Sequence, residues 1–120
     1  MGVSVKLSSA SVSKALRNID KYKVYAVNQV KEEIAYTALS VESDAKRRCP
    51  VKTGRLRASI KTLIASSGLG AIVGTPVEYA ADVEFGSSSR KAKPYLFPAA
   101  ESARAGFIAR LKQIFKRNKI

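Results

Sequence analysis

Histidine and tryptophan are absent from this chain of 120 residues, and cysteine occurs once, at Cys49. Without histidine, the chain lacks the side chain that most often acts as a general base and most often binds a metal. A single cysteine cannot close an internal disulfide, which favours a reducing compartment. The acidic residues show neither an EF-hand pattern nor a paired-carboxylate spacing. We therefore expect no metal and no cofactor.

Long apolar runs and the motifs of common enzymes are also missing. No apolar stretch approaches the roughly 20 residues that a membrane span needs, so we expect no membrane partner. The phosphate-binding patterns GxxxxGK(S/T) and GxGxxG do not occur, nor does the nucleophile pattern GxSxG. The sequence therefore predicts a protein that is not an enzyme. A small basic ribonuclease that uses only Lys, Arg and Glu stays as an alternative.

Acidic residues are scarce. Nine Asp and Glu stand against 22 Lys and Arg, which gives a formal net charge of +13 and a pI near 10.2. A charge this large indicates an anionic neighbour, which could be nucleic acid, an acidic protein surface or a membrane. A basic face that is simply solvated is the plainer interpretation.

The length suits one domain with a modest core. Residues 3–7 alternate apolar and polar side chains, which predicts a short half-buried strand. Ser8, Ser9 and Ser11 can begin a short helix that runs to about residue 19. Asp20 can cap a long helix from about residue 21 to residue 49, because Pro50 disfavours helical geometry at the residue before it.

The predicted long helix would span about 40 Å at 1.5 Å per residue. It carries an apolar stripe whose members recur every three or four residues: Val27, Val30, Ile34, Ala38, Val41 and Ala45. Two interpretations stay open. Either part of this stripe is reserved for a neighbouring molecule, or the helix packs along its whole length on the rest of its own domain.

Residues 60–64 and 71–75 predict the two strands of a β-hairpin around a glycine-containing turn. Within the second strand, Gly74 marks a bulge or a close backbone approach. From about Pro98 the spacing predicts a final amphipathic helix, whose basic face could alternatively lie on a membrane. The expected fold class is α+β, with the long helix and the C-terminal amphipathic helix packed on a small antiparallel β-sheet.

A short helical turn is predicted between the hairpin and the final helix, with Tyr79, Val83 and Phe85 on one face and Gly86 as its C-cap. The acids Glu78, Asp82 and Glu84 would then lie on the surface. They either solubilise the turn or meet the basic patch of an adjacent copy.

Basic residues concentrate at the end of the long helix and just after it. Between residues 45 and 77 there are seven of them and no acid: Lys46, Arg47, Arg48, Lys52, Arg55, Arg57 and Lys61. Residues 86–93 add a second basic segment with little apolar content, which we expect to be a mobile loop. Its cations are Arg90, Lys91 and Lys93.

Several short motifs follow one another in a set order. Residues 45–50 read A-K-x-x-x-P, residues 51–60 read V-x-T-G-R-L-R-x-S-I, and residues 83–86 read V-E-F-G. Residues 94–99 then read P-x-L-x-P-A. With a long helix before them and an amphipathic helix after them, they resemble the small neck proteins of long-tailed double-stranded DNA phages, which are head–tail joining or tail-completion proteins. The resemblance covers residues 34–114.

The resemblance implies a structural virion protein, present in the host cytoplasm during assembly, that forms a ring at the head–tail junction or the top of the tail. Such a ring completes the tail for joining and surrounds the DNA channel. Its partners would be further copies, six preferred by analogy with tail symmetry and twelve as the alternative, and other neck, connector or tail proteins. It could contact DNA non-specifically. A free non-specific DNA-binding protein of the cytoplasm is the alternative function.

We expect one neck or tail-completion domain over residues 1–120, with its subunit or partner interface between residues 79 and 98. The expected interface residues are Tyr79, Glu84, Phe85, Gly86, Arg90, Lys91, Lys93, Pro94, Tyr95, Phe97 and Pro98.

Overall fold

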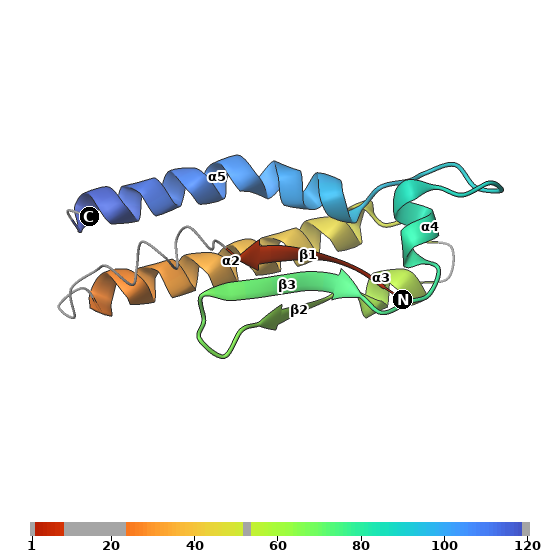
Figure 1. The fold of residues 1–120 in the computed structure, drawn as a ribbon. Helices are drawn as coiled ribbons and strands as arrows, with labels where there is room; N and C mark the ends of the chain where they lie inside the picture. Colours follow the sequence, from red (N-terminus) through yellow and green to blue (C-terminus); the bar gives the residue numbers. More distant parts are fainter. Residues whose placement is uncertain (1, 9–23, 52–53, 119–120) are drawn as a thin grey trace.

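The computed structural model describes residues 2–8, 24–51 and 54–118 (Figure 1). Its elements in chain order are β1 (Val3–Ser8), α2 (Val24–Arg48), α3 (Arg55–Ser59), β2 (Lys61–Ile64), β3 (Gly70–Thr75), α4 (Ala80–Phe85) and α5 (Leu96–Arg117). Long helices combined with a small antiparallel sheet confirm the predicted α+β class.

The two long helices lie side by side and run in opposite directions, and the sheet packs on α2 (Figure 1). The sheet has three strands in the order β1-β3-β2, with both pairings antiparallel. The molecule is elongated, with extents of 54 × 24 × 21 Å. The helices α3 and α4 lie together at one end of its long axis, where α2 finishes and α5 begins (Figure 1).

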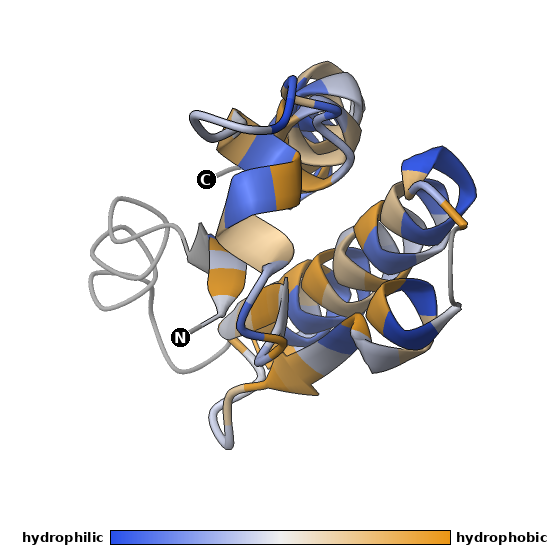
Figure 2. Cartoon of the chain, turned by 90° about the vertical axis from the view of Figure 1, so that its right-hand side faces the viewer, coloured by the Kyte–Doolittle hydropathy of each residue, from blue (hydrophilic) through white to orange (hydrophobic). Residues whose placement is uncertain are grey.

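Helix α2 buries one stripe along its length. The core residues of this stripe run from Val30 through Ile34 and Val41 to Ala45, and Cys49 continues it just past the helix end. Apolar and polar residues alternate around the long helices in the end-on view (Figure 2). Over the described residues 24–48, the buried stripe of the helix therefore packs within its own chain, as the second interpretation predicts. The exposed apolar residues of α2, such as Tyr36 and Leu39, lie outside this stripe.

The boundaries of α2 agree with the sequence where they can be compared. The helix ends at Arg48, and the amide of Cys49 still donates to the carbonyl of Ala45 at 2.9 Å before Pro50. Several predictions fall outside the described residues: the short helix up to Ile19, the Asp20 cap and the start of the long helix at residue 21.

The predicted hairpin is confirmed as β2 and β3, with Leu63 opposite Ile72. Strand β1, far away in the sequence, completes the sheet on the other edge of β3, where Ser4 lies opposite Gly74. The register of β1 on β3 is continuous, so Gly74 marks a close backbone approach and no bulge. A Cβ atom at Gly74 would lie 2.4 Å from the carbonyl oxygen of Val3. Glycine is therefore required for β1 to pair at this position.

We predict that Gly74→Ala destabilises the fold by about 1–3 kcal/mol, because the added methyl group forces the β1 backbone away from β3. Urea unfolding followed by circular dichroism measures this change.

Gly106→Ala is the matched control, because it makes the same substitution inside helix α5. The nearest atom to a Cβ there is the guanidinium tip of Arg110, which can move aside. Alanine is the better helix former by about 0.5–1 kcal/mol, so this variant should be as stable as the parent or more stable. Equal losses in the two variants would contradict the close approach at Gly74.

Candidate functional site

The start of α5 is held by one buried carboxylate. Glu84, on α4, is only 3% exposed. Its Oε1 accepts hydrogen bonds from the backbone amides of Tyr95 at 3.2 Å and Leu96 at 2.9 Å, and its Oε2 accepts from Phe97 at 3.2 Å. The first amides of a helix have no partner within the helix and carry partial positive charge, so a carboxylate there satisfies and stabilises them. The expectation that Glu84 lies on the surface is wrong: it caps α5.

Tyr95 lies inside the chain next to this cap and is fully buried. Burial first, and then the negative charge of Glu84, raise the pKa of the Tyr95 hydroxyl above its usual value. The hydroxyl has no hydrogen-bond partner among the residues that the structure describes. Of the predicted interface residues, Glu84 and Tyr95 therefore build the subunit's interior, and any interface must use the other members.

Two exposed aromatic rings flank the cap on the outside. Phe85 is 62% exposed and Phe97 is 43% exposed, and their ring centroids are 5.5 Å apart with the planes tilted by 42°. This spacing is favourable for an aromatic pair. The prediction that Phe85 shares one face with Tyr79 and Val83 is wrong, because Val83 is buried and Tyr79 half-buried while Phe85 points to solvent.

The basic segment 86–93 forms a turn beside these rings. Gly86 ends α4 with a φ of 82°, a left-handed value that favours glycine, so its predicted C-cap role is confirmed. Ser87 and Arg90 exchange two backbone hydrogen bonds, at 2.8 and 3.3 Å, and the amide of Lys93 donates to the carbonyl of Val83 at 2.8 Å. The mobility of this segment stays a prediction.

All three cations of this segment are exposed, and no ion pair between described residues includes any of them. They are Arg90, Lys91 and Lys93. Pro94 beside them is exposed too, whereas Pro98 is half-buried in the first turn of α5. We call the exposed group of Phe85, Phe97, Arg90, Lys91 and Lys93 the tip surface.

Arg55, from the basic patch, binds an acid of its own chain. Its guanidinium donates to both oxygens of Glu78, at 3.0 and 3.1 Å, and lies 5.6 Å from the centre of the Tyr79 ring. The hydrogen bond from Arg55 and its charge hold the pKa of the Glu78 carboxyl below its usual value. Glu78 therefore contacts a basic residue of its own subunit, whereas the sequence left open whether these acids solubilise the turn or meet the basic patch of an adjacent copy.

The rest of the basic patch spreads over several elements. Lys46 pairs with Glu42 at 3.5 Å, Arg48 pairs with Asp44 at 3.0 Å, and Arg47 also pairs with Asp44. Arg57 is half-buried and donates to the carbonyl of Cys49 at 3.4 Å, while Lys61 is exposed on β2. Lys52 lies outside the described residues. Much of this patch is thus engaged inside the subunit.

The structure brings two distant segments together around a cleft of about 640 Å³. Its walls come from the turn after α2, from α3 and α4, and from the basic segment: Pro50, Arg55, Leu56, Tyr79, Val83, Ser89, Arg90, Lys91 and Lys93. The sequence shows both basic segments but gives no sign that they face each other across apolar residues. Pro50, Leu56, Val83 and Ser89 were therefore missed as site residues.

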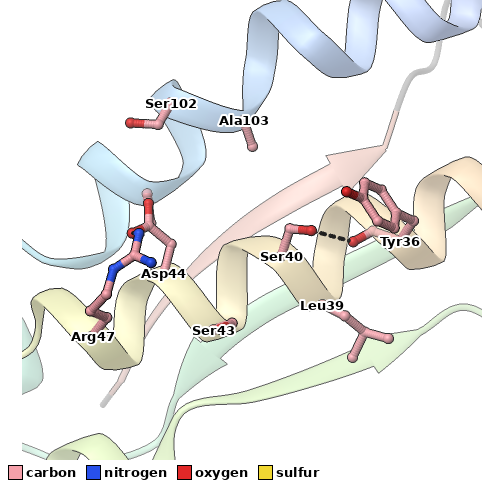
Figure 3. Close-up of a pocket in the computed structure, with 9 residues that line it drawn as sticks. Tyr36, Leu39, Ser40, Ser43, Asp44, Arg47, Ser102 and Ala103 are labelled. Carbon is pink, nitrogen blue, oxygen red and sulfur yellow. Dashed lines mark hydrogen bonds and ion pairs between the residues drawn. The ribbon is translucent and has the colours of Figure 1, made fainter.

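A second hollow, of about 530 Å³, lies between α2 and the first turns of α5 (Figure 3). Small side chains such as Ser43, Ser102 and Ala103 line it, with Tyr36 at one side. The Ser40 hydroxyl there donates to the backbone carbonyl of Tyr36 at 2.9 Å, which is a local helix contact. The acid in this lining, Asp44, pairs with Arg47 and Arg48.

The described parts of the chain contain no cluster of three or more side chains that could hold a metal ion. Burial, the largest influence, raises the pKa of the Cys49 thiol, which makes it a poor nucleophile. Among the helices that the structure describes, none is long and apolar enough to cross a membrane.

Comparison with protein families gives one match. The model of the family described as "Bacteriophage HK97-gp10, putative tail-component" matches residues 13–86. The match includes the V-E-F-G motif and ends there, before the P-x-L-x-P-A motif at residues 94–99. Comparisons with curated proteins and with solved structures give no significant match.

We predict that Glu84→Gln lowers the free energy of unfolding by about 1.5–3 kcal/mol, because it removes a charged acceptor from a buried helix end. Urea denaturation measures the loss.

Asp82→Asn is the matched control, since Asp82 is an exposed acid on the same short helix. It should leave stability within about 0.5 kcal/mol of the parent. The cap would be refuted as a stabilising contact if both variants unfolded at the same urea concentration.

We also predict that a carbon-13 NMR titration finds the Glu78 pKa lowered, and that Arg55→Gln raises it toward the ordinary glutamate value. Since the folded-state pKa is depressed, the contribution of this pair to stability is present at neutral pH and disappears as the pH falls through that pKa. Arg104→Gln, at an exposed arginine on α5, should leave the Glu78 titration unchanged. A Glu78 pKa that does not respond to Arg55→Gln would contradict this.

Proposed function

The chain belongs to the HK97-gp10-like family of bacteriophage tail components, and on that premise we propose that it forms a ring at the head–tail junction or the top of the tail. In this position it completes the tail for joining to the head and surrounds the DNA channel. The observation that carries the proposal is the tip surface, where two aromatic rings stay exposed although the backbone under them is firmly capped by Glu84.

Exposed aromatic rings are typical of the central part of a protein interface. Within the tip surface, the backbone amide of Phe97 itself donates to the Glu84 carboxylate. Phe85 is the last residue of α4. Their positions are therefore fixed before a partner arrives, which lowers the entropy cost of association. A ring needs one surface of each subunit to meet a different surface of the next, and the tip surface serves as one of these two surfaces.

Charge pairing between copies contributes less than the sequence suggested. Glu84 caps α5 and Glu78 binds Arg55, so Asp82 is the acid of residues 78–84 that neither caps α5 nor forms an ion pair between described residues. We therefore propose that the aromatic pair of Phe85 and Phe97, rather than the acidic residues, makes the main contact between subunits.

A free, non-specific DNA-binding protein is the second candidate, and it is favoured by the three cations of the tip surface, which form no ion pair with another described residue. Affinity for duplex DNA separates the two functions. A binder that contacts several phosphates loses affinity with a log–log salt slope of about −0.9 per contact. A ring subunit only has to tolerate DNA in its channel, so its affinity for DNA need not fall steeply as the salt concentration rises.

We predict closed oligomers of the wild-type chain in light scattering across protein and salt concentration, and their loss in Phe85→Ala. Tyr25→Ala is the matched control, because Tyr25 is an aromatic residue that is 70% exposed on α2, near the opposite end of the molecule (Figure 1). It should keep the oligomer.

If the free protein is a monomer near 13.0 kDa, the same two variants are compared in phage lacking the native protein. Phe85→Ala should then leave heads and tails unjoined, while Tyr25→Ala restores infectious particles. Normal joining with Phe85→Ala would overturn the proposed role of the tip surface.

A further inference from the structure

The cleft beside the tip surface has an apolar floor. Leu56 and Val83 line it and are almost fully buried. Pro50 and Tyr79 lie around them and are half-buried. The volume of about 640 Å³ falls in the range of clefts that bind ligands, which are mostly apolar with a few placed polar groups. The cleft therefore has room for an aromatic or aliphatic side chain.

The rim on the outer side is cationic. Arg90, Lys91 and Lys93 line the cleft from the turn of residues 86–93, and no ion pair between described residues neutralises them. Ser89 adds an exposed hydroxyl to the same wall. An occupant that matches both features carries an apolar side chain next to negative charge.

The chain itself is a poor source of such an occupant. Its described carboxylates are mostly engaged: Glu33, Glu42, Asp44, Glu78 and Glu101 in ion pairs, and Glu84 in the helix cap. Among the described residues this leaves Glu32 and Asp82. Copies of a chain with a formal charge of +13 also repel one another at a cationic rim. The occupant must therefore come from a more acidic molecule.

A protein segment fits this cleft better than a nucleic acid. Phosphate contacts need cations and backbone amides, and they leave an apolar floor of Leu56 and Val83 unused. A stacked base would need an open aromatic face, but the guanidinium of Arg55 lies over the Tyr79 ring.

We propose that the cleft receives an acidic segment of a neighbouring virion protein. One aromatic or aliphatic side chain of that segment lies on Leu56 and Val83, and its flanking carboxylates pair with Lys91 and Lys93. This specifies the partner chemistry of the tip surface and in that sense rests on the proposed function.

The test uses the full-length chain labelled with nitrogen-15 and the capped tripeptide acetyl-Glu-Phe-Glu-amide as the probe. Addition of the peptide should shift the amide signals of Leu56, Val83 and residues 89–93. Lys91→Glu combined with Lys93→Glu should weaken binding about tenfold, because two favourable charge pairs become repulsive. The charge-reversed peptide acetyl-Lys-Phe-Lys-amide should leave these signals in place.

Lys112→Glu combined with Lys116→Glu is the matched control. Both lysines are exposed near the far end of α5, and the pair changes the net charge by the same amount (Figure 1). It should alter the affinity for the peptide less than twofold. Equal weakening by the two double variants would show general charge attraction and overturn the proposal.

Three further outcomes would also overturn it. The first is that the peptide shifts no cleft signal when it is raised to tens of millimolar. The second is that a 12-base-pair DNA duplex shifts the same signals and displaces the peptide. The third is that the cleft signals shift with protein concentration alone, which would make a second copy the occupant. The first two outcomes leave the light-scattering test of the ring unaffected, so failure of this inference is distinguishable from failure of the proposed function.

Discussion

One carboxylate sets the arrangement of the end of the molecule where the proposed contacts lie. Glu84 binds three successive amides at the start of α5, and thereby joins the short helix α4 to α5, which packs against α2. Residues 86–94 of the connection between them carry few apolar side chains that could fix it by packing, and within residues 86–95 only Tyr95, at the end, is fully buried. Its ends are tied instead by the cap and by the bond from Lys93 to Val83. Without the cap, the positions of the aromatic pair and of the cationic turn relative to each other would no longer be fixed.

The Glu84 cap explains how the exposed rings of Phe85 and Phe97 can be attached to a well-ordered backbone. Phe97 follows directly from Leu96, which is fully buried, and Phe85 follows directly from Glu84. Each ring is therefore attached to backbone that is held from the inside. Apolar surface that stays exposed on a rigid support is suited to binding, since association then orders few additional groups.

Patterns local to one element were predictable from the sequence, and contacts between elements were not. The stripe of α2, its end before Pro50, the hairpin and the C-cap at Gly86 all follow from periodicity and backbone geometry over a few residues. The sequence favours a surface position for Glu84, because the acids of residues 78–85 fall outside the predicted apolar face, and nothing within its helix reveals amide partners eleven to thirteen residues further on. The pairing of β1 with β3 could not be predicted for the same reason. Gly74 indicates a close approach of another backbone segment, but the strand that approaches lies about 70 residues earlier in the chain.

The sequence gives the total charge of the chain, but it does not show which charged residues pair with one another in the fold. The fold consumes most of the described acids internally, in helix pairs, in the Arg55–Glu78 contact and in the cap of α5. The total of +13 therefore leaves many cations without an ion pair between described residues, among them Arg90, Lys91 and Lys93 of the tip surface. Like charges there disfavour contact between copies through that rim, whereas the adjacent aromatic pair is the contact that we propose between copies. The two features are reconciled if the rings contact the next subunit and the cationic cleft contacts a different, acidic protein, so that one end of the chain serves two neighbours.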